Sequence, residues 1–203
     1  MSTAILPPWD IGELPPMPVR RFTVDEYQRL GELGFLTPED RVELLEGWIV
    51  QKMTNNPSHA ATIELIDEAL RPLLPVDLRM RFQLPITTID SAPEPDVAIV
   101  RGGPRDRARR HPRPDDVVLI IEVAESSLER GRGPKGRLYA RAAIPVYWIV
   151  NLIDRRIEVH TNPTGPTDEP KFQQTITYGP DDDLPVLVEG IQLTHLNVAE
   201  LLP

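Results

Sequence analysis

The spacing of hydrophobic residues predicts three helices. Apolar residues recur at every third or fourth position over 58–74, which is typical of an amphipathic helix, and Pro72 should end that helix early. The segment Thr23-Val-Asp-Glu26 is a capping box and predicts a shorter helix that extends to about Leu33. A third helix is expected near 135–143.

Strands account for most of the remaining pattern. Val117–Ile121 is apolar at every position, as expected for a central strand covered on both faces, and Tyr147–Val150 should be its neighbour. Residues 41–50 favour two short strands around a turn at Glu46-Gly47. The longer strands are predicted at 77–84, 96–101, 116–124, 146–152, 156–161 and 172–178. This order of elements predicts an α/β (α+β) fold in which helices flank a mixed β-sheet.

The chain of 203 residues has the length of one domain of ordinary size. Several of its 23 prolines crowd the N-terminus. We therefore expect an extended proline-rich arm over 1–20 and a single domain over 21–203. Near the C-terminus, Asp181-Asp-Asp183 and the apolar stretch after it predict a surface loop and a closing element.

Composition excludes several classes of function. The absence of cysteine excludes disulfides, thiolate zinc sites, iron–sulfur clusters and a cysteine nucleophile. The net charge of -9 provides no general attraction to nucleic acid or acidic membranes. No apolar run approaches the ~18–20 residues of a membrane span, and the N-terminus does not have the basic region of a signal peptide. We expect a soluble, cytoplasmic protein with no membrane partner.

Glu122 is the most informative residue, because it lies within the apolar run that should form a buried strand. Burying an unpaired carboxylate costs several kcal/mol, so the group is protonated or a positive charge lies beside it. A metal ion and Lys135 are the candidate partners. The alternatives are a strand-end carboxylate that faces solvent and a purely structural domain in which Glu122 is protonated.

A second carboxylate and a lysine complete the candidate site. Asp96 begins the strand after Pro95, and two carboxylates at neighbouring strand ends would suit Mg²⁺, which takes one or two carboxylates together with water and phosphate. Pro134 is favoured in the first turn of a helix, which places Lys135 at the exposed start of the third helix. Its ammonium could reach back toward Glu122. Turn chemistry at Asp96 and a solvated lysine are the alternatives.

Together these residues resemble the PD-(D/E)XK nuclease superfamily, and more closely its Uma-type restriction endonucleases. The resemblance extends from about Arg21 to Leu202. Its matching segments are Val42–Gly47, His59, Pro95-Asp96, Glu122–Ser127, Pro134-Lys135 with Tyr139, and Ile144–Val150. It implies a restriction-endonuclease-like core and a nuclease activity.

The resemblance also implies a role for each site residue. Asp96 and Glu122 would be metal ligands for Mg²⁺, with Mn²⁺ as a possible substitute, and Lys135 would be the catalytic lysine. Glu43 would be an additional acidic residue, a role for which Glu46 competes.

Ala124 stands where the superfamily commonly has its lysine, and strand alternation puts it on the same face as Glu122, so the ammonium of Lys135 could fill the space there. The Uma-type families are similar in carrying the lysine on the helix. The chain departs from the family pattern at two positions. Gly131 stands where an acidic residue often precedes the lysine, and Asn151 where Asp is usual. Both leave room for a weakened or inactive enzyme.

A basic segment lies between the two carboxylate strands. Its local charge of +5 comes from one Asp and from six arginines, which are Arg101, Arg105, Arg107, Arg109, Arg110 and Arg113. Such a loop could hold a nucleic-acid backbone, or it could be a solvated connection. His59 could lie near the site but is more often structural at a helix start, and the other histidines do not have metal-ligand spacing.

We expect a Mg²⁺-dependent endonuclease that hydrolyses DNA phosphodiester bonds. Because cutting both strands of a duplex generally needs two sites, we expect a homodimer. The alternative is a catalytically weak or inactive nuclease-like scaffold that binds nucleic acid or a partner protein.

Overall fold

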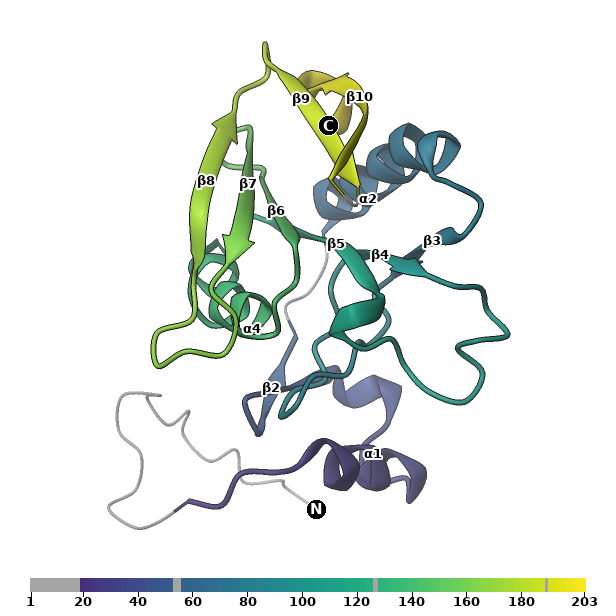
Figure 1. The fold of residues 1–203 in the computed structure, drawn as a ribbon. Helices are drawn as coiled ribbons and strands as arrows, with labels where there is room; N and C mark the ends of the chain where they lie inside the picture. The colour runs from purple at the N-terminus through teal and green to yellow at the C-terminus, as the bar shows by residue number, and fades with distance from the viewer. Residues whose placement is uncertain (1–18, 53–55, 126–127, 189) are drawn as a thin grey trace.

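A six-stranded mixed sheet forms the centre of the fold. The computed structural model describes residues 19–52, 56–125, 128–188 and 190–203. The strand order is β3-β4-β5-β6-β7-β8, in which β5 and β6 are parallel and all other neighbours are antiparallel (Figure 1). The strands are β3 (Leu78–Phe82), β4 (Val97–Arg101), β5 (Val117–Ala124), β6 (Val146–Asn151), β7 (Arg156–Pro163) and β8 (Phe172–Tyr178). The predicted mixed sheet is therefore confirmed.

Helices and two hairpins surround this sheet. The helical segments are α1 (Val24–Glu32), η1 (Pro38–Asp40), α2 (Pro57–Leu70), η2 (Arg71–Leu73), η3 (Pro114–Asp116), α3 (Leu128–Arg130), η4 (Gly131–Lys135), α4 (Gly136–Arg141) and η5 (Val198–Leu201). The hairpins are β1 (Val42–Leu45) with β2 (Trp48–Gln51) and β9 (Asp183–Val188) with β10 (Ile191–Asn197). The capping box of α1 and the early end of α2 are confirmed. The predictions did not include the β9–β10 hairpin.

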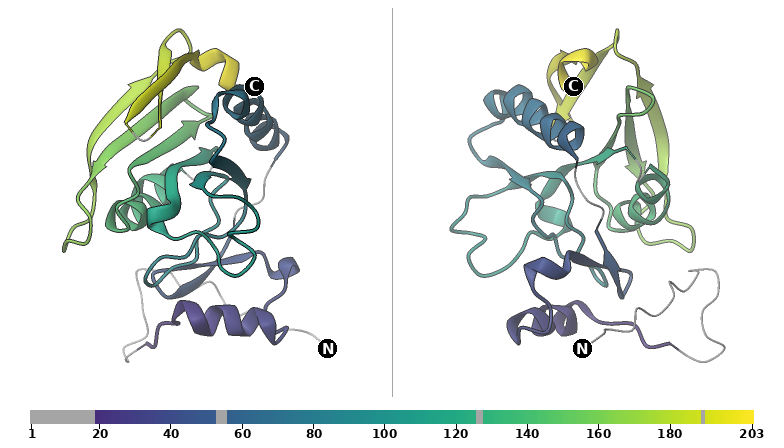
Figure 2. Two further views of the ribbon diagram at one scale, coloured as in Figure 1. Left: turned by 45° about the vertical axis from the view of Figure 1, so that its right-hand side comes forward. Right: turned by 180° about the vertical axis from the view of Figure 1, so that it is seen from behind.

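Two apolar clusters cover the two faces of the sheet. On one face, α2 and the β9–β10 hairpin pack side by side, with Ile66 and Leu184 in the same buried cluster as Trp148 (Figures 1 and 2). On the other face, Leu138 of α4 packs in a cluster with Ile149 of β6. The sheet is thus the middle of three layers.

The central strand β5 is buried along its whole length, as predicted. Ile121 and Val123 belong to the cluster beneath α2, whereas Ile120 and Ala124 belong to the cluster beneath α4. Because side chains alternate along a strand, Glu122 points toward α4. The polypeptide that connects β5 to its parallel neighbour β6 passes over this face, and Lys135 lies on that connection.

The N-terminal elements lie below the sheet, where α1 and the β1–β2 hairpin form a separate small unit (Figure 2). Most of the predicted arm, residues 1–18, lies outside the described residues. In the part of the chain that the structure describes, no helix is long and apolar enough to cross a membrane.

Candidate active site

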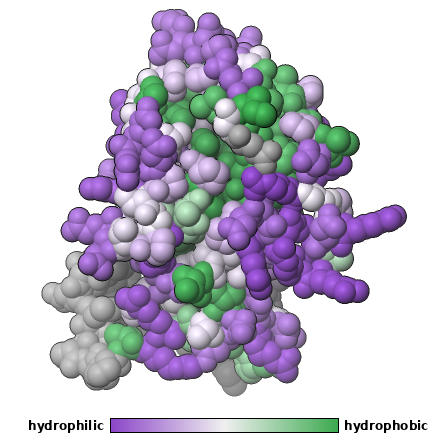
Figure 3. Space-filling view, viewed as in Figure 1, coloured by the Kyte–Doolittle hydropathy of each residue, from purple (hydrophilic) through white to green (hydrophobic). Residues whose placement is uncertain are grey.

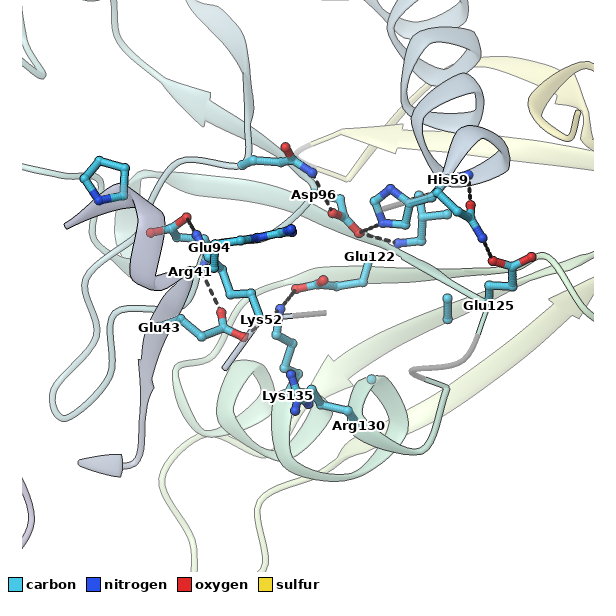
Figure 4. Close-up of a pocket in the computed structure, with 16 residues that line it drawn as sticks. Arg41, Glu43, Lys52, His59, Glu94, Asp96, Glu122, Glu125, Arg130 and Lys135 are labelled. Carbon is cyan, nitrogen blue, oxygen red and sulfur yellow. Dashed lines mark hydrogen bonds and ion pairs between the residues drawn. The ribbon is translucent and has the colours of Figure 1, made fainter. Parts of the chain in front are cut away.

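A pocket of about 510 Å³ lies where β4 begins and β5 ends (Figure 4). Its carboxylates are Glu43, Glu94, Asp96, Glu122 and Glu125, and its cations are Arg41, Lys52, Arg130 and Lys135. These residues come from the β1–β2 hairpin and its flanks, from the β3–β4 connection, from the ends of β4 and β5, and from the helical connection between β5 and β6. The four residues that sequence analysis assigned to chemistry therefore meet in one place.

The ammonium of Lys135 lies between two carboxylates. Its Nζ is 2.8 Å from Oε1 of Glu122 and 3.5 Å from Oε1 of Glu43. The hydroxyl of Tyr139, one turn further along the helix, also donates to Oε1 of Glu122 at 2.7 Å. Lys135 and Tyr139 thus both donate hydrogen bonds to Oε1 of Glu122. These contacts compensate for the burial of this carboxylate within the strand.

Lys135 is 7% exposed, so the expectation that it lies at the exposed start of a helix is wrong. The cause is a π-helical turn over Gly131–Lys135, which contains Pro134 in the middle of a continuous helical segment. Proline has no N–H to donate to the preceding turn, and widened turns of this kind occur often at functional sites. The turn rotates Lys135 inward beneath the sheet.

Two side-chain contacts hold this π-helical turn in place. Arg132 forms a two-point ion pair with the carboxylate of Glu158, which is buried on β7. The hydroxyl of Tyr147 donates to the carbonyl of Gly131 at 3.1 Å. The position of Lys135 is therefore fixed from the neighbouring strands as well as by its own ion pair.

Burial and neighbouring charges shift both members of the Glu122–Lys135 pair. Burial raises the pKa of Glu122 to about 7, and the charges of Asp96 and Glu43 add to the effect, which Lys135 only partly offsets. Burial lowers the pKa of Lys135, but the carboxylates of Glu122 and Glu43 outweigh it, so the pKa is raised. Lys135 therefore remains an ammonium ion, while Glu122 changes protonation near neutral pH.

Asp96 is held at the start of β4 by donors from two elements. Its Oδ2 accepts a hydrogen bond from the amide of Val123 at 2.8 Å and lies 3.1 Å from Nε2 of His59. Its Oδ1 makes one long contact, 3.4 Å, with the side-chain amide of Gln83. Burial lowers the pKa of His59, but Asp96 outweighs that effect and raises it.

Glu43 and Glu46 take different positions. Glu43 is buried in the pocket, where Oε2 accepts a hydrogen bond from the amide of Glu94 at 3.0 Å. Glu46 lies outside the pocket lining and pairs with Arg137 and Arg141. Geometry therefore favours Glu43 over Glu46 as the additional acidic residue.

The departures from the family pattern have local structural reasons. A Cβ at Gly131 would lie 3.3 Å from the Tyr147 hydroxyl, so any side chain there would crowd that hydroxyl and require a small shift. Asn151 is buried and lies outside the pocket lining. Its side-chain Nδ2 donates to Oδ2 of Asp154 in the β6–β7 turn, and its Oδ1 accepts a hydrogen bond from the Asp154 amide. Ala124 lies on the α4 face with Glu122, as expected.

The donor set suits a hard divalent cation that keeps much of its water. Among the described residues, no three His, Cys, Asp or Glu side chains are arranged to hold a metal ion. However, Oε2 of Glu122 has no hydrogen-bond partner among those residues, and Oδ1 of Asp96 has only the long contact to Gln83. Two carboxylate oxygens in an open pocket fit Mg²⁺, which rarely has an all-protein shell.

The arginine-rich loop lies at the other end of the β4–β5 hairpin, at the right of Figure 1, where hydrophilic side chains project in Figure 3. The six arginines are absent from the lining of the pocket that contains Asp96. Arg107 and Arg110 pair with Asp116, and Arg101 donates to the carbonyl of Asp115. A second pocket of about 650 Å³ lies between this loop and α1.

Sequence analysis did not assign roles to several residues of the pocket. Lys52, one of only three lysines in the chain, lies 2.5 Å from Glu94 at the pocket wall. For His59, a place near the site and a structural role at the helix start were both left open, and the structure shows its ring in contact with Asp96. Tyr139 appeared only as part of a matching segment. The rarity of lysine was the one available signal, because the other contacts join elements that are far apart in sequence.

Comparisons with known proteins agree with this fold. A search of curated proteins found no match. The crystal structure of a putative nuclease of DUF820 from Anabaena variabilis matches with a TM-score of 0.63 and 20% sequence identity, over 89% of this chain and 97% of that one. The core is thus restriction-endonuclease-like, as predicted. The family Uma2, described as "Putative restriction endonuclease", matches residues 24–199. The chain belongs to the Uma2 family.

Proposed function

We propose that this protein is a divalent-metal-dependent endonuclease that hydrolyses DNA phosphodiester bonds at the pocket. One observation supports this most strongly: Asp96, Glu122, Glu43 and a buried Lys135 line the same pocket, and Lys135 Nζ lies within 3.5 Å of both glutamates. Membership of a nuclease family points to the same chemistry. Mg²⁺ is the proposed cofactor, and Mn²⁺ would substitute.

Asp96 and Glu122 would hold the cation through Oδ1 and Oε2. Bound there, a divalent ion would offset charge on the scissile phosphate and make water more acidic. Lys135 stays protonated, because two carboxylates raise its pKa. We therefore propose that Lys135 acts as a cationic hydrogen-bond donor to the phosphate or to the attacking water, and not as a general base.

Glu43 fixes the ammonium from the opposite side. Its Oε2 is held by the amide of Glu94, which leaves Oε1 directed toward Lys135. Because the Glu94 amide fixes the Glu43 carboxylate, Glu43 would keep the Lys135 ammonium in position when a phosphate binds. We also propose Glu43 as the residue that completes the acidic cluster through bound water.

Outside the pocket, the DNA backbone would contact arginines of the arginine-rich loop. Arg105 and Arg109 are exposed and make no side-chain hydrogen bond or ion pair among the described residues, so they are available to phosphates. The loop lies at the far end of the hairpin, which would place its contacts away from the scissile bond. Cutting both strands of a duplex would require a second copy of the chain.

Plasmid cleavage at low salt with Mg²⁺ or Mn²⁺ tests the proposal. We would compare wild type with Glu122→Gln and Lys135→Met, and use Lys171→Met as the matched control, because Lys171 is exposed and lies outside the pocket. The proposal predicts metal-dependent nicking in wild type and in the control, reduced by at least about 100-fold in both pocket variants.

Activity that persists in both pocket variants would indicate a contaminating nuclease and contradict the assignment. If no protein cleaves the plasmid while metal still binds to the pocket, the protein would instead be a nuclease-like scaffold that binds nucleic acid or a partner protein. Thermal unfolding of each variant would confirm that the comparison is made between folded proteins.

A further inference from the structure

Each candidate ligand carboxylate is fastened by one oxygen to a side chain of a helix. Oδ2 of Asp96 meets Nε2 of His59, from the first turn of α2, at 3.1 Å. Oε1 of Glu122 accepts a hydrogen bond from the hydroxyl of Tyr139, on α4, at 2.7 Å. The two helices cover opposite faces of the sheet, so the two carboxylates are fixed independently from opposite sides.

Both donors are themselves held rigidly. Tyr139 is fully buried, and its ring packs edge-on against Tyr147 with centroids 5.1 Å apart. The His59 side chain is 12% exposed. Its backbone amide donates to the Asn56 side chain that caps α2. Both donors can therefore impose a position on a carboxylate.

The contact with Asp96 is the main polar interaction of the His59 ring. The other ring nitrogen, Nδ1, is buried and has no hydrogen-bond partner among the described residues. Burying a polar ring without compensation is costly, so a histidine at this place needs Asp96 as its partner. An apolar side chain would fill the same space between α2 and the sheet without that cost, which indicates that the hydrogen bond is the reason for histidine here.

We propose that His59 and Tyr139 are positioning residues that tie one oxygen of each carboxylate and thereby direct Oδ1 of Asp96 and Oε2 of Glu122 toward one cation. This inference rests on the proposed metal-dependent function. Groups that orient metal ligands contribute strongly to binding, and their loss typically weakens metal affinity by about 10–100-fold. A free carboxylate would instead rotate between several positions, and binding a metal would then carry the cost of ordering it.

A Mn²⁺ titration by calorimetry at one pH tests the proposal. Tyr139→Phe removes only the hydroxyl, and His59→Leu removes the ring nitrogen but keeps an apolar side chain. We expect both to bind Mn²⁺ about 10–100-fold more weakly than wild type. His59→Gln retains an N–H near the position of Nε2, so it should recover most of the affinity that His59→Leu loses.

Two matched controls make the same chemical changes elsewhere. Tyr178→Phe alters a half-buried tyrosine whose hydroxyl makes no hydrogen bond among the described residues. His160→Leu alters a half-buried histidine on β7 whose Nε2 makes no hydrogen bond among those residues and lies 3.7 Å from Oε2 of Glu158. Neither lines the pocket, so both should bind Mn²⁺ like wild type. Wild-type affinity in Tyr139→Phe and His59→Leu, or an equal loss in His59→Gln and His59→Leu, would overturn the proposal.

Metal-free crystal structures supply a readout that does not depend on metal binding. In wild type, the carboxylates of Asp96 and Glu122 should each occupy one conformation. His59→Leu leaves only the Val123 amide on Oδ2 of Asp96, and Tyr139→Phe leaves only Lys135 on Oε1 of Glu122, so each variant should give its carboxylate an additional conformation. If wild type bound no Mn²⁺, the proposed function would fail, and the crystal structures would still decide the positioning role. Unchanged carboxylate conformations in both variants would overturn it.

Discussion

The two ends of the β4–β5 hairpin carry charge in opposite ways. At one end, Asp96, Glu122 and Lys135 are each less than 10% exposed and line one pocket. At the other end, the arginine-rich loop is largely exposed, and two of its arginines pair with the single carboxylate of Asp116. The loop has the larger net charge, yet the pocket contains the arrangement that can perform chemistry.

This difference shows which charges in a sequence are informative. A run of arginines at the surface is easily solvated or paired with its own neighbours, so its function is not evident from the run itself. A carboxylate within an apolar strand has to be compensated, because an unpaired buried charge costs several kcal/mol. Glu122 therefore indicates a partner, and the structure provides Lys135 and Tyr139.

The largest expected effect is on stability at the pocket. Lys135→Met removes the cation that contacts both Glu122 and Glu43, so the buried carboxylate of Glu122 loses its ion-pair partner. We expect the free energy of unfolding, measured in urea at pH 8, to fall by about 3–5 kcal/mol. The loss should shrink at pH 6, where Glu122 is protonated. Lys171→Met should change stability by no more than about 0.5 kcal/mol, and an equal effect of the two variants would remove the contrast between buried and exposed charge.

A smaller effect separates the two glutamates of the first hairpin. Glu43→Gln removes the second carboxylate beside Lys135, and we expect plasmid cleavage to slow by about 10–100-fold because the ammonium loses part of its orientation. Glu46→Gln alters only the pairs with Arg137 and Arg141 outside the pocket, so cleavage should stay near the wild-type rate. If Glu46→Gln were the slower enzyme, the assignment of Glu43 would be wrong.

Mn²⁺ affinity and stability should both depend on pH near neutrality, because burial raises the pKa of Glu122 to about 7. The exposed arginines of the loop do not titrate in this range. Metal binding requires the carboxylate, so Mn²⁺ affinity should rise by about tenfold between pH 6 and pH 8. In the metal-free protein, the contribution of Glu122 to stability should fall, not rise, as the pH increases. Since the folded-state pKa lies above 4.5, the value for an exposed glutamate, this group contributes stability at low pH that is lost as pH rises through about 7. If neither the Mn²⁺ affinity nor the stability changed with pH, the raised pKa of Glu122 would be contradicted.

The smallest effect is expected at the arginine-rich loop. Replacing Arg105 and Arg109 together with serine should weaken DNA binding a few-fold at low salt and reduce the slope of log affinity against log salt by up to about 2. Arg110→Ser should instead lower stability slightly, because Arg110 pairs with Asp116. An unchanged salt slope in the double variant would mean that the loop is a solvated connection.

The sequence was sufficient for much of the fold, and it offered Lys135 as one of two candidate partners of Glu122. The apolar run around Glu122 predicted a buried strand, and alternation placed its side chain on the same face as Ala124. Pro95 and Asp96 predicted the start of the neighbouring strand. These features follow from local patterns of burial and turn chemistry, which neighbouring residues encode directly.

Other features could not be predicted, because they depend on contacts between distant elements. Pro134 was interpreted by its usual preference for a first helical turn, whereas the preceding helical residues make it part of a π-helical turn that buries Lys135. The β9–β10 hairpin was missed because Pro185 lies within β9, and proline ordinarily argues against a strand. The contact of His59 with Asp96 spans two elements and has no local signal.

Anomalous diffraction from a crystal soaked in Mn²⁺ tests the central claim most directly, because it locates the ion without reference to activity. The account predicts a peak in the pocket within about 2.0–2.3 Å of Oδ1 of Asp96 and Oε2 of Glu122, with Lys135 remaining in contact with Oε1 of Glu122. A pocket without a peak at saturating Mn²⁺, or a peak that does not contact both carboxylates, would contradict the claim that these residues form a metal-dependent catalytic centre.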